Sequence, residues 1–119
     1  MRATVSVHSG FAVGAVDPRL FGGFLEHIGR AVYQGVFEPG SPQADARGFR
    51  RDVLALLRGL RMTAMRYPGG NFASGYHWED GVGPHRPTVR ELAWQSLEPN
   101  TFGTDEYLAL CRAMDWTPM

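Results

Sequence analysis

The sequence predicts an α/β fold built from strand, loop and helix units. Met62–Met65 is a short apolar run typical of a buried strand. The segment before it has apolar residues at helical spacing, namely Phe49, Val53, Leu57 and Leu60. In folds of this class, ligands gather at the carboxyl ends of the parallel strands, so the function is to be sought there.

The amino-terminal residues predict a separate β segment. Residues 3–8 alternate polar and apolar side chains, Ser9-Gly10 predicts a turn, and residues 11–13 predict a returning strand. Asp17-Pro18 marks a boundary. We therefore expect a β segment over residues 1–16 and an α/β domain over residues 17–119.

The apolar run Leu20–Leu25 predicts the first strand of that domain. Period-two alternation places Phe24 and Glu26 on one face. Glu26 then sits at the carboxyl end, where a carboxylate meets water and ligand; the alternative is a solvated loop residue or a partner of Arg30. His27 favours a packed, hydrogen-bonded structural role over that of a general base.

Further elements follow in order. Residues 35–48 predict a loop, and the helical spacing after it predicts the first crossover helix, with its arginines facing solvent. Leu92–Trp94 predicts a short element. Thr104 is expected to cap a second helix that buries its apolar side chains, namely Leu108, Cys111 and Met114.

The stretch Arg66–Pro84 is the strongest candidate for a binding surface. Pro68-Gly69-Gly70 must end the preceding strand, which places Arg66 at its carboxyl end. Aromatic faces and hydrogen-bonding groups follow, an assortment that suits a carbohydrate. The aromatic side chains are Tyr76, Trp78 and Trp94, and the polar ones are Arg66, Asn71 and His77. The alternative is that Tyr76 and Trp78 only pin a long loop.

Composition and charge disfavour several classes of function. Twelve basic and twelve acidic residues give formal neutrality, which disfavours nucleic acid or an anionic membrane as partner. The start of the chain lacks the apolar core of a secretory signal, and no run is long enough to span a membrane, so a cytoplasmic location is expected. The single cysteine, Cys111, is expected to be a core residue.

The remaining groups of polar residues indicate no further catalytic or metal site. Glu79 and Asp80 are adjacent and diverge in extended backbone, so their spacing does not make a catalytic carboxylate pair. The four histidines show no metal-ligand spacing, and no metal site is expected.

The stretch Arg66–Pro84, together with Phe21–Arg30, resembles glycoside hydrolase family 51, whose members are chiefly α-L-arabinofuranosidases. The similarity extends from about Asp17 to about Met114. The resemblance implies a retaining hydrolase without a cofactor, on a (β/α)8 TIM barrel of about 250 residues. This chain would hold the first two to three βα units, and residues 1–16 would join a β-sandwich domain.

Position by position, the resemblance implies supporting roles. Glu26 and Asn71 would hydrogen-bond the arabinofuranosyl ring, and Gly70 would line the same pocket. Arg66 would keep the nucleophile carboxylate ionised, as a nearby guanidinium does, and Trp94 would stack on the next sugar. The catalytic glutamates would lie beyond Met119, so the isolated 119-residue chain is expected to be inactive.

The leading hypothesis is an α-L-arabinofuranosidase that releases terminal non-reducing arabinofuranosyl residues from arabinan- or arabinoxylan-derived saccharides with retention. Arabinose-containing saccharides would be its partners, with a homo-oligomeric parent left open. A barrel hydrolase acting on xylosides or glucans is the nearest alternative. A non-catalytic carbohydrate-binding protein or an inert gene remnant is the alternative from another class.

Overall fold

Three short parallel strands form the central sheet in the computed structural model, which describes residues 1–119. They lie side by side in chain order: β1 (Gly23–Phe24), β2 (Ala64–Arg66) and β5 (Thr117–Pro118). In the sequence, helix α1 (Arg51–Gly59) separates β1 from β2, and helix α2 (Thr104–Met114) separates β2 from β5. Each strand reaches its parallel neighbour through a helical connection, which confirms the expected α/β class.

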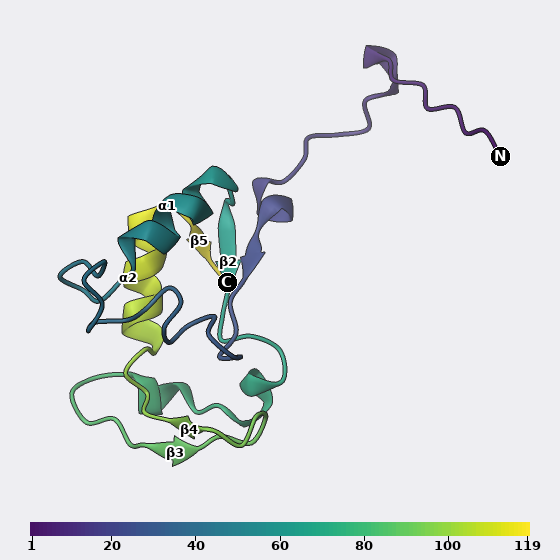
Figure 1. Ribbon diagram of the computed structural model, residues 1–119. Coiled ribbons are helices and arrows are strands. Elements are labelled where there is room, and N and C mark those ends of the chain that lie inside the picture. Colours follow the sequence, from purple (N-terminus) through teal and green to yellow (C-terminus); the bar gives the residue numbers. More distant parts are fainter.

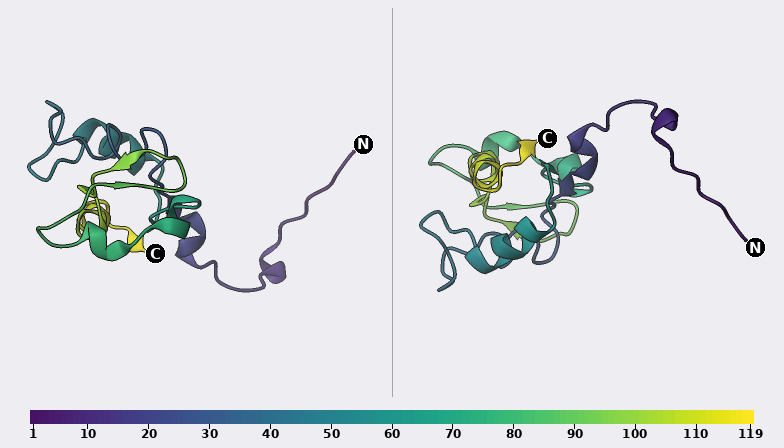
Figure 2. Two further views of the ribbon diagram at one scale, coloured as in Figure 1. Left: turned by 90° about the horizontal axis from the view of Figure 1, so that it is seen from below. Right: turned by 90° about the horizontal axis from the view of Figure 1, so that it is seen from above.

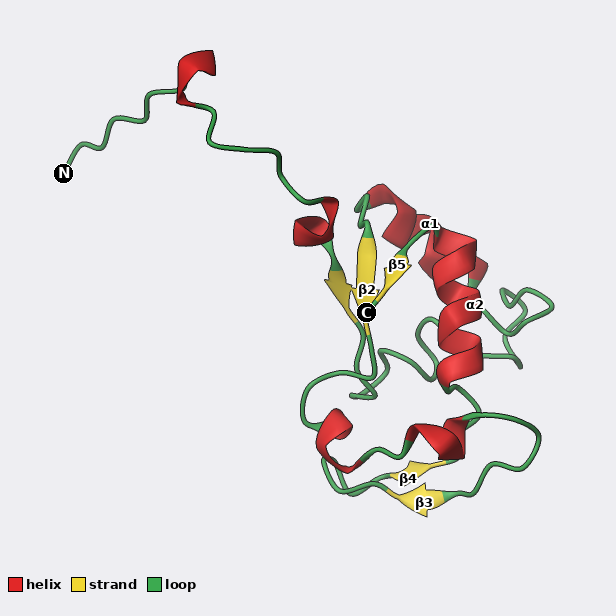
Figure 3. Ribbon diagram, turned by 180° about the vertical axis from the view of Figure 1, so that it is seen from behind, coloured by secondary structure: helices red, strands yellow, loops and turns green.

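Both helices lie on one side of this sheet (Figure 3). Alternation along the strands turns Leu25 and Met65 toward them, and these side chains are only 7% and 4% exposed. Phe24 pairs with Arg66 across the sheet, and both are exposed. The sheet therefore has one packed face and one open face, and the open face carries Phe24 and Arg66.

The hydrophobic core joins the packed face of the sheet to both helices and to the segment between β1 and α1. Its completely or almost completely buried members include Val32, Phe49, Phe102, Leu110 and Cys111. The prediction that Cys111 is a core residue is confirmed. Burial raises the pKa of its thiol, which keeps it protonated at neutral pH.

Helix α1 follows the predicted spacing through most of its length. Leu54 is 3% exposed, and Val53 and Leu57 pack against the core. The expected burial of Leu60 is wrong, because this residue lies past the helix and is 66% exposed. Arg61 follows in the left-handed region with a φ of 53°, which turns the chain away and leaves Leu60 outside.

Helix α2 begins one residue away from its expected cap. Gly103 is the cap, Thr104 is the first helical residue, and the Glu106 carboxylate accepts the Gly103 N–H at 2.8 Å. A Cβ at Gly103 would lie 2.1 Å from the Gly81 carbonyl oxygen, so this position has no room for a threonine. The helix ends at Met114, and Asp115 caps it in the left-handed region with a φ of 58°.

The amino-terminal segment runs away from the sheet (Figure 2) and is exposed throughout. The strands expected over residues 3–8 and 11–13 are absent. Ser9–Phe11 forms a 3-10 turn instead, in which His8 Nδ1 accepts the Gly10 N–H at 3.0 Å. Strand patterning alone cannot form a strand here, because no second strand lies alongside to complete the hydrogen bonds.

The first strand of the sheet is shorter than the run Leu20–Leu25 that predicted it. Pro18–Phe21 forms a 3-10 turn, and the Asp17 carboxylate accepts the Arg19 N–H at 2.9 Å. An aspartate followed by proline favours this capped turn over an extended strand. The strand is therefore confined to Gly23–Phe24.

A long excursion, residues 67–103, follows β2 at the carboxyl ends of the strands (Figure 1). It contains 3-10 turns at Phe72–Gly75 and Trp78–Gly81, and an antiparallel hairpin of β3 (Val89–Arg90) and β4 (Leu97–Glu98). We call this segment the rim loop.

The hairpin is an element that sequence patterning missed. Its two strands contain only two residues each, which is too short for a detectable alternation of side chains. The short element expected at Leu92–Trp94 lies in the turn between these strands. Neither helix of the fold has the length and apolar content needed to cross a lipid bilayer.

Candidate functional site

Glu26 lies just past the carboxyl end of β1, as predicted, and is partly buried. Its Oε1 accepts the Phe72 backbone N–H at 3.0 Å. The contact joins residues 46 positions apart, because the rim loop returns across the end of β1. Its partner is thus a backbone amide of the rim loop, and one carboxylate oxygen has a fixed orientation.

Two glycines bring the rim loop close to Glu26. Gly69 has a φ of +125°, and a Cβ there would lie 2.3 Å from Glu26 Cβ, so both its conformation and the close approach require glycine. A Cβ at Gly70 would lie 3.5 Å from Glu26 Oε2, in ordinary contact. Gly70 therefore lies beside the Glu26 carboxylate.

Arg66 is the last residue of β2, and its guanidinium lies on the open face of the sheet. The guanidinium carbon is 5.0 Å from the centre of the Phe24 ring, and Nη2 donates to the Gly69 carbonyl at 3.3 Å. Asn71 follows in the rim loop, exposed, with no side-chain hydrogen bond to the turn that it begins. Both side chains are thus available at the strand ends near Glu26.

Trp94 lies in the turn of the hairpin and is 39% exposed. The buried Glu91 carboxylate organises this turn, because it accepts the backbone N–H groups of Ala93, Trp94 and Ser96 at 2.7 to 2.9 Å. Burial alone would raise the pKa of Glu91, but the hydrogen bonds from Trp94, Ser96 and Ala93 outweigh it and hold the pKa below its usual value. The carboxylate therefore remains charged and fixes Trp94.

Trp94 faces a hollow of about 190 Å³ between the hairpin and the segment after β1. The hollow is lined by His27, Gly29, Val32, Tyr33, Trp94, Ser96, Leu97 and Glu98. Glu26 does not line this hollow, but His27, the next residue in the sequence, does. The structure thus divides the predicted residues into a cluster around Glu26 and a platform at Trp94.

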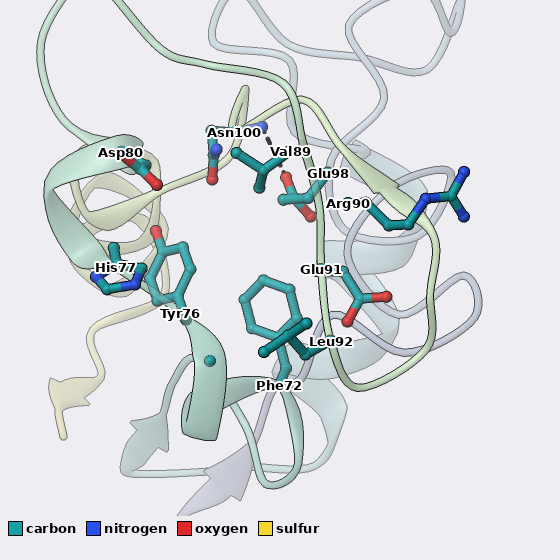
Figure 4. A pocket seen from close by; sticks show the side chains of 11 residues that line it. Phe72, Tyr76, His77, Asp80, Val89, Arg90, Glu91, Leu92, Glu98 and Asn100 are labelled. Carbon is teal, nitrogen blue, oxygen red and sulfur yellow. Dashed lines mark hydrogen bonds between the residues drawn. The ribbon is translucent and has the colours of Figure 1, made fainter.

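A second hollow, of about 230 Å³, lies inside the rim loop (Figure 4). Phe72 and Leu92 both line it, and the Tyr76 hydroxyl points toward Asp80 and Asn100. Arg90 turns its guanidinium away from the hollow. The loop therefore encloses mainly its own side chains here.

The sequence predicts Tyr76 and His77 as candidates for sugar contacts. The Tyr76 ring packs 5.0 Å from the Phe72 ring, and its hydroxyl is buried against Gly81. This placement fits the alternative that Tyr76 pins the loop. His77 borders the second hollow, and Trp78 is 59% exposed beside it.

The sequence did not single out Glu91 or Glu98, although both are buried in the hairpin. The only available signal was an acidic side chain close to a turn, where it can accept backbone N–H groups. The histidine prediction is confirmed, because His27 is buried and lies 2.9 Å from the Tyr67 hydroxyl. No group of three or more metal-binding side chains occurs in the structure.

Comparison with known proteins identifies relatives across most of the chain. The family model described as the alpha-L-arabinofuranosidase 1 domain matches residues 56–119. An intracellular exo-α-(1→5)-L-arabinofuranosidase of Streptomyces lividans is 60% identical over 112 residues, covering 92% of this chain and 17% of that protein. A Bacillus subtilis enzyme described in the same words is 49% identical over 116 residues, covering 96% and 23%.

Solved structures agree with these sequence matches. A family 51 α-L-arabinofuranosidase from Bifidobacterium longum superposes with a TM-score of 0.84 at 51% identity, covering 87% of this chain and 20% of that one. An arabinose complex of the Thermotoga maritima enzyme gives 0.80 at 51% identity, covering 82% and 21%. The chain spans about a fifth of the length of these relatives.

Proposed function

This chain belongs to the α-L-arabinofuranosidases of glycoside hydrolase family 51, and we propose that its protein releases terminal non-reducing α-L-arabinofuranosyl residues with retention. Arabinan- and arabinoxylan-derived saccharides would be its substrates. We extend to it the intracellular location named for the Streptomyces lividans and Bacillus subtilis relatives, as a cytoplasmic enzyme without a cofactor.

We propose that the sheet is the first part of a (β/α)8 barrel. Three parallel strands in chain order with helices on one side support this architecture, because a barrel repeats this arrangement until it closes. The open face with Phe24 and Arg66 would then face the barrel interior. Residues 1–16 would join a β-sandwich domain, which agrees with their exposed position away from the sheet.

The rim residues have distinct roles in this proposal. Glu26 and Asn71 hydrogen-bond the hydroxyls of the arabinofuranosyl ring, and Gly70 leaves room for the ring beside Glu26. Trp94 stacks on the next sugar of the substrate. The fixed Glu26 carboxylate supports the first role, since an orientation set by the Phe72 amide does not have to be ordered again when the sugar binds.

Arg66 acts on the chemistry indirectly. Retaining hydrolysis requires two carboxyl groups about 5 to 5.5 Å apart, one ionised to attack and one protonated to donate. A guanidinium next to the first lowers its pKa and keeps it ionised. We propose that Arg66 does this for a glutamate of the complete protein, and that neither catalytic glutamate is among these 119 residues.

The observation that carries the proposal is the Glu26 contact at the end of β1. Family membership predicts a carboxylate there for the sugar, and the loop after β2 holds it in place through Phe72 and Gly69. A solvated loop residue would not require a glycine backbone against its Cβ.

The test is hydrolysis by the complete gene product. We expect release of L-arabinose from arabino-oligosaccharides. NMR distinguishes the α- and β-anomers of the first-formed product, and the α-anomer would establish retention. Glu26→Gln should lower kcat/KM by about 100-fold, because a charged hydrogen-bond partner of the sugar is lost. Glu79→Gln is the matched control, since Glu79 is exposed and makes no side-chain hydrogen bond to the Glu26 contact.

Other results would favour the alternatives. Faster hydrolysis of xylosides or glucans would assign a related barrel hydrolase. Saccharide binding without hydrolysis by the complete product would support a non-catalytic binding protein, and neither activity would support a gene remnant.

A further inference from the structure

A buried carboxylate and a buried imidazole join the hairpin to the segment after β1. The side chains of Glu98 on β4 and His27 are 4% and 3% exposed, and Glu98 Oε2 lies 3.0 Å from His27 Nδ1. His27 Nδ1 has no aligned hydrogen bond, and the Glu98 oxygen is the polar atom placed beside it. Because a buried polar group without a polar neighbour is costly, this contact favours a fixed position of the hairpin against the strand end.

The second oxygen of Glu98 is held as firmly. Oε1 accepts the Asn100 N–H at 2.8 Å and the Tyr33 hydroxyl. Burial, and then the bond to Glu98, raises the pKa of Tyr33 above its usual range, so its hydroxyl keeps its proton and donates. Tyr33 in turn accepts the Phe102 N–H at 3.3 Å. Glu98 is therefore fixed from several directions.

His27 connects Glu98 to the first part of the rim loop. Its ring stacks on the Phe72 ring, with the centroids 4.4 Å apart and the planes 18° apart. The backbone N–H of Phe72 is the donor that orients Glu26. A continuous set of contacts thus runs from Glu98 through His27 and Phe72 to Glu26.

The same pair also adjoins the Trp94 platform. Glu98 is on the hairpin whose turn carries Trp94, and His27, Glu98 and Trp94 line one hollow of about 190 Å³. Moving the hairpin would therefore move Trp94 relative to Glu26.

We propose that Glu98 and His27 are positioning residues, which set the separation between the Glu26 carboxylate and the Trp94 ring. They do so through the Phe72 ring and the hairpin backbone, without bonding the sugar. The inference rests on the proposed function, because a fixed separation matters for a saccharide with one sugar at Glu26 and the next at Trp94.

The decisive variant is Glu98→Gln in the complete gene product. The amide oxygen still accepts from Tyr33 and Asn100, while an amide NH2 group replaces the carboxylate oxygen that faces His27. We expect KM for an arabinodisaccharide to rise about 10- to 100-fold, as small misplacements of binding groups do, with a smaller change in kcat. An aryl arabinofuranoside, which has no second sugar, should show a smaller rise. Glu79→Gln, the same change at an exposed site, should leave both substrates unaffected.

Unchanged KM and kcat in Glu98→Gln, with a lower melting temperature, would overturn the proposal and leave a purely structural pair. Should this variant fail to fold, Tyr33→Phe removes only one bond to Glu98 and should change the disaccharide KM in the same direction. A crystal structure of either variant provides a readout without activity. A shifted Phe72 amide or Trp94 ring in the variant supports the positioning proposal, and unchanged positions refute it. This readout holds even if the wild-type protein is inactive and the proposed hydrolysis is thereby refuted.

Discussion

The sheet with its two helices and the rim loop are stabilised in different ways. The first region is held by apolar packing around residues such as Phe49 and Leu110. Three of the four buried polar or charged residues are in the rim loop, namely Glu91, Glu98 and Asn100. Apolar burial is non-directional and determines whether the chain folds, whereas buried hydrogen bonds are directional and determine where side chains lie. The proposed site residues Glu26 and Trp94 accordingly depend on the polar region for their positions.

The largest effect should come from the apolar region. Phe49 is 0% exposed, so Phe49→Ala removes a whole aromatic ring from the core and should lower the free energy of unfolding by about 3–5 kcal/mol. Urea denaturation measures this. The control is Leu56→Ala in α1, where the side chain is 77% exposed and the change should stay within about 0.5 kcal/mol. Equal effects at the two sites would contradict the assignment of the core.

A pair of neighbouring glycines tests the junction between the two regions. Gly69→Ala places a methyl group 2.3 Å from Glu26 Cβ at a φ of +125°, and should cost about 1–3 kcal/mol. Gly70→Ala puts its methyl group in ordinary contact, 3.5 Å from Glu26 Oε2, and should cost less than about 1 kcal/mol. Thermal unfolding of both variants decides the matter. Similar losses would mean that the close approach at Gly69 relaxes easily.

The polar region should respond to pH through Glu91. Because the folded pKa of Glu91 lies below its usual value of 4.5, its contribution is present above pH 4.5 and is lost as pH falls through the folded pKa. Glu91→Gln should cost about 1 kcal/mol at neutral pH and remove this part of the acid sensitivity. Unfolding measured from pH 3 to 7 tests it. Parallel curves for wild type and variant would show that Glu91 does not titrate with folding.

The smallest effect concerns reactivity rather than stability. Burial raises the pKa of Cys111, so iodoacetamide should label the folded protein slowly and the urea-unfolded protein rapidly. Mass spectrometry measures the two rates. Rapid labelling under native conditions would show that α2 separates from the core more readily than its packing indicates.

The two regions also differ in how far the sequence predicted them. The spacing of Val53 and Leu57 predicted α1, and the run ending at Met65 predicted β2, because packing against one face imposes a period that can be read locally. The predicted strand-end positions of Glu26 and Arg66 followed from the same patterning and are confirmed.

The rim loop could not be predicted in this way. The contact of Glu98 with His27 joins residues 71 positions apart, and no local pattern specifies such a pairing. The two-residue strands of the hairpin are too short to show alternation. The strands expected near the amino terminus illustrate the reverse case, in which a local pattern was present but no neighbouring strand completed it. The roles of Asn71, Gly70 and Trp94 with a sugar remain predictions for the experiments above.

The backbone contact between Gly81 and Gly103 has an evolutionary consequence. Neither position has room for a side chain, so the part of the rim loop between them, residues 82–102, starts and ends at nearly the same point in space. The entropic cost of closing a loop rises only slowly with its length. Residues could therefore be added to or removed from residues 82–102 without rebuilding the α/β body. Related proteins could thereby differ in the length of this single closed segment while they keep the same α/β body.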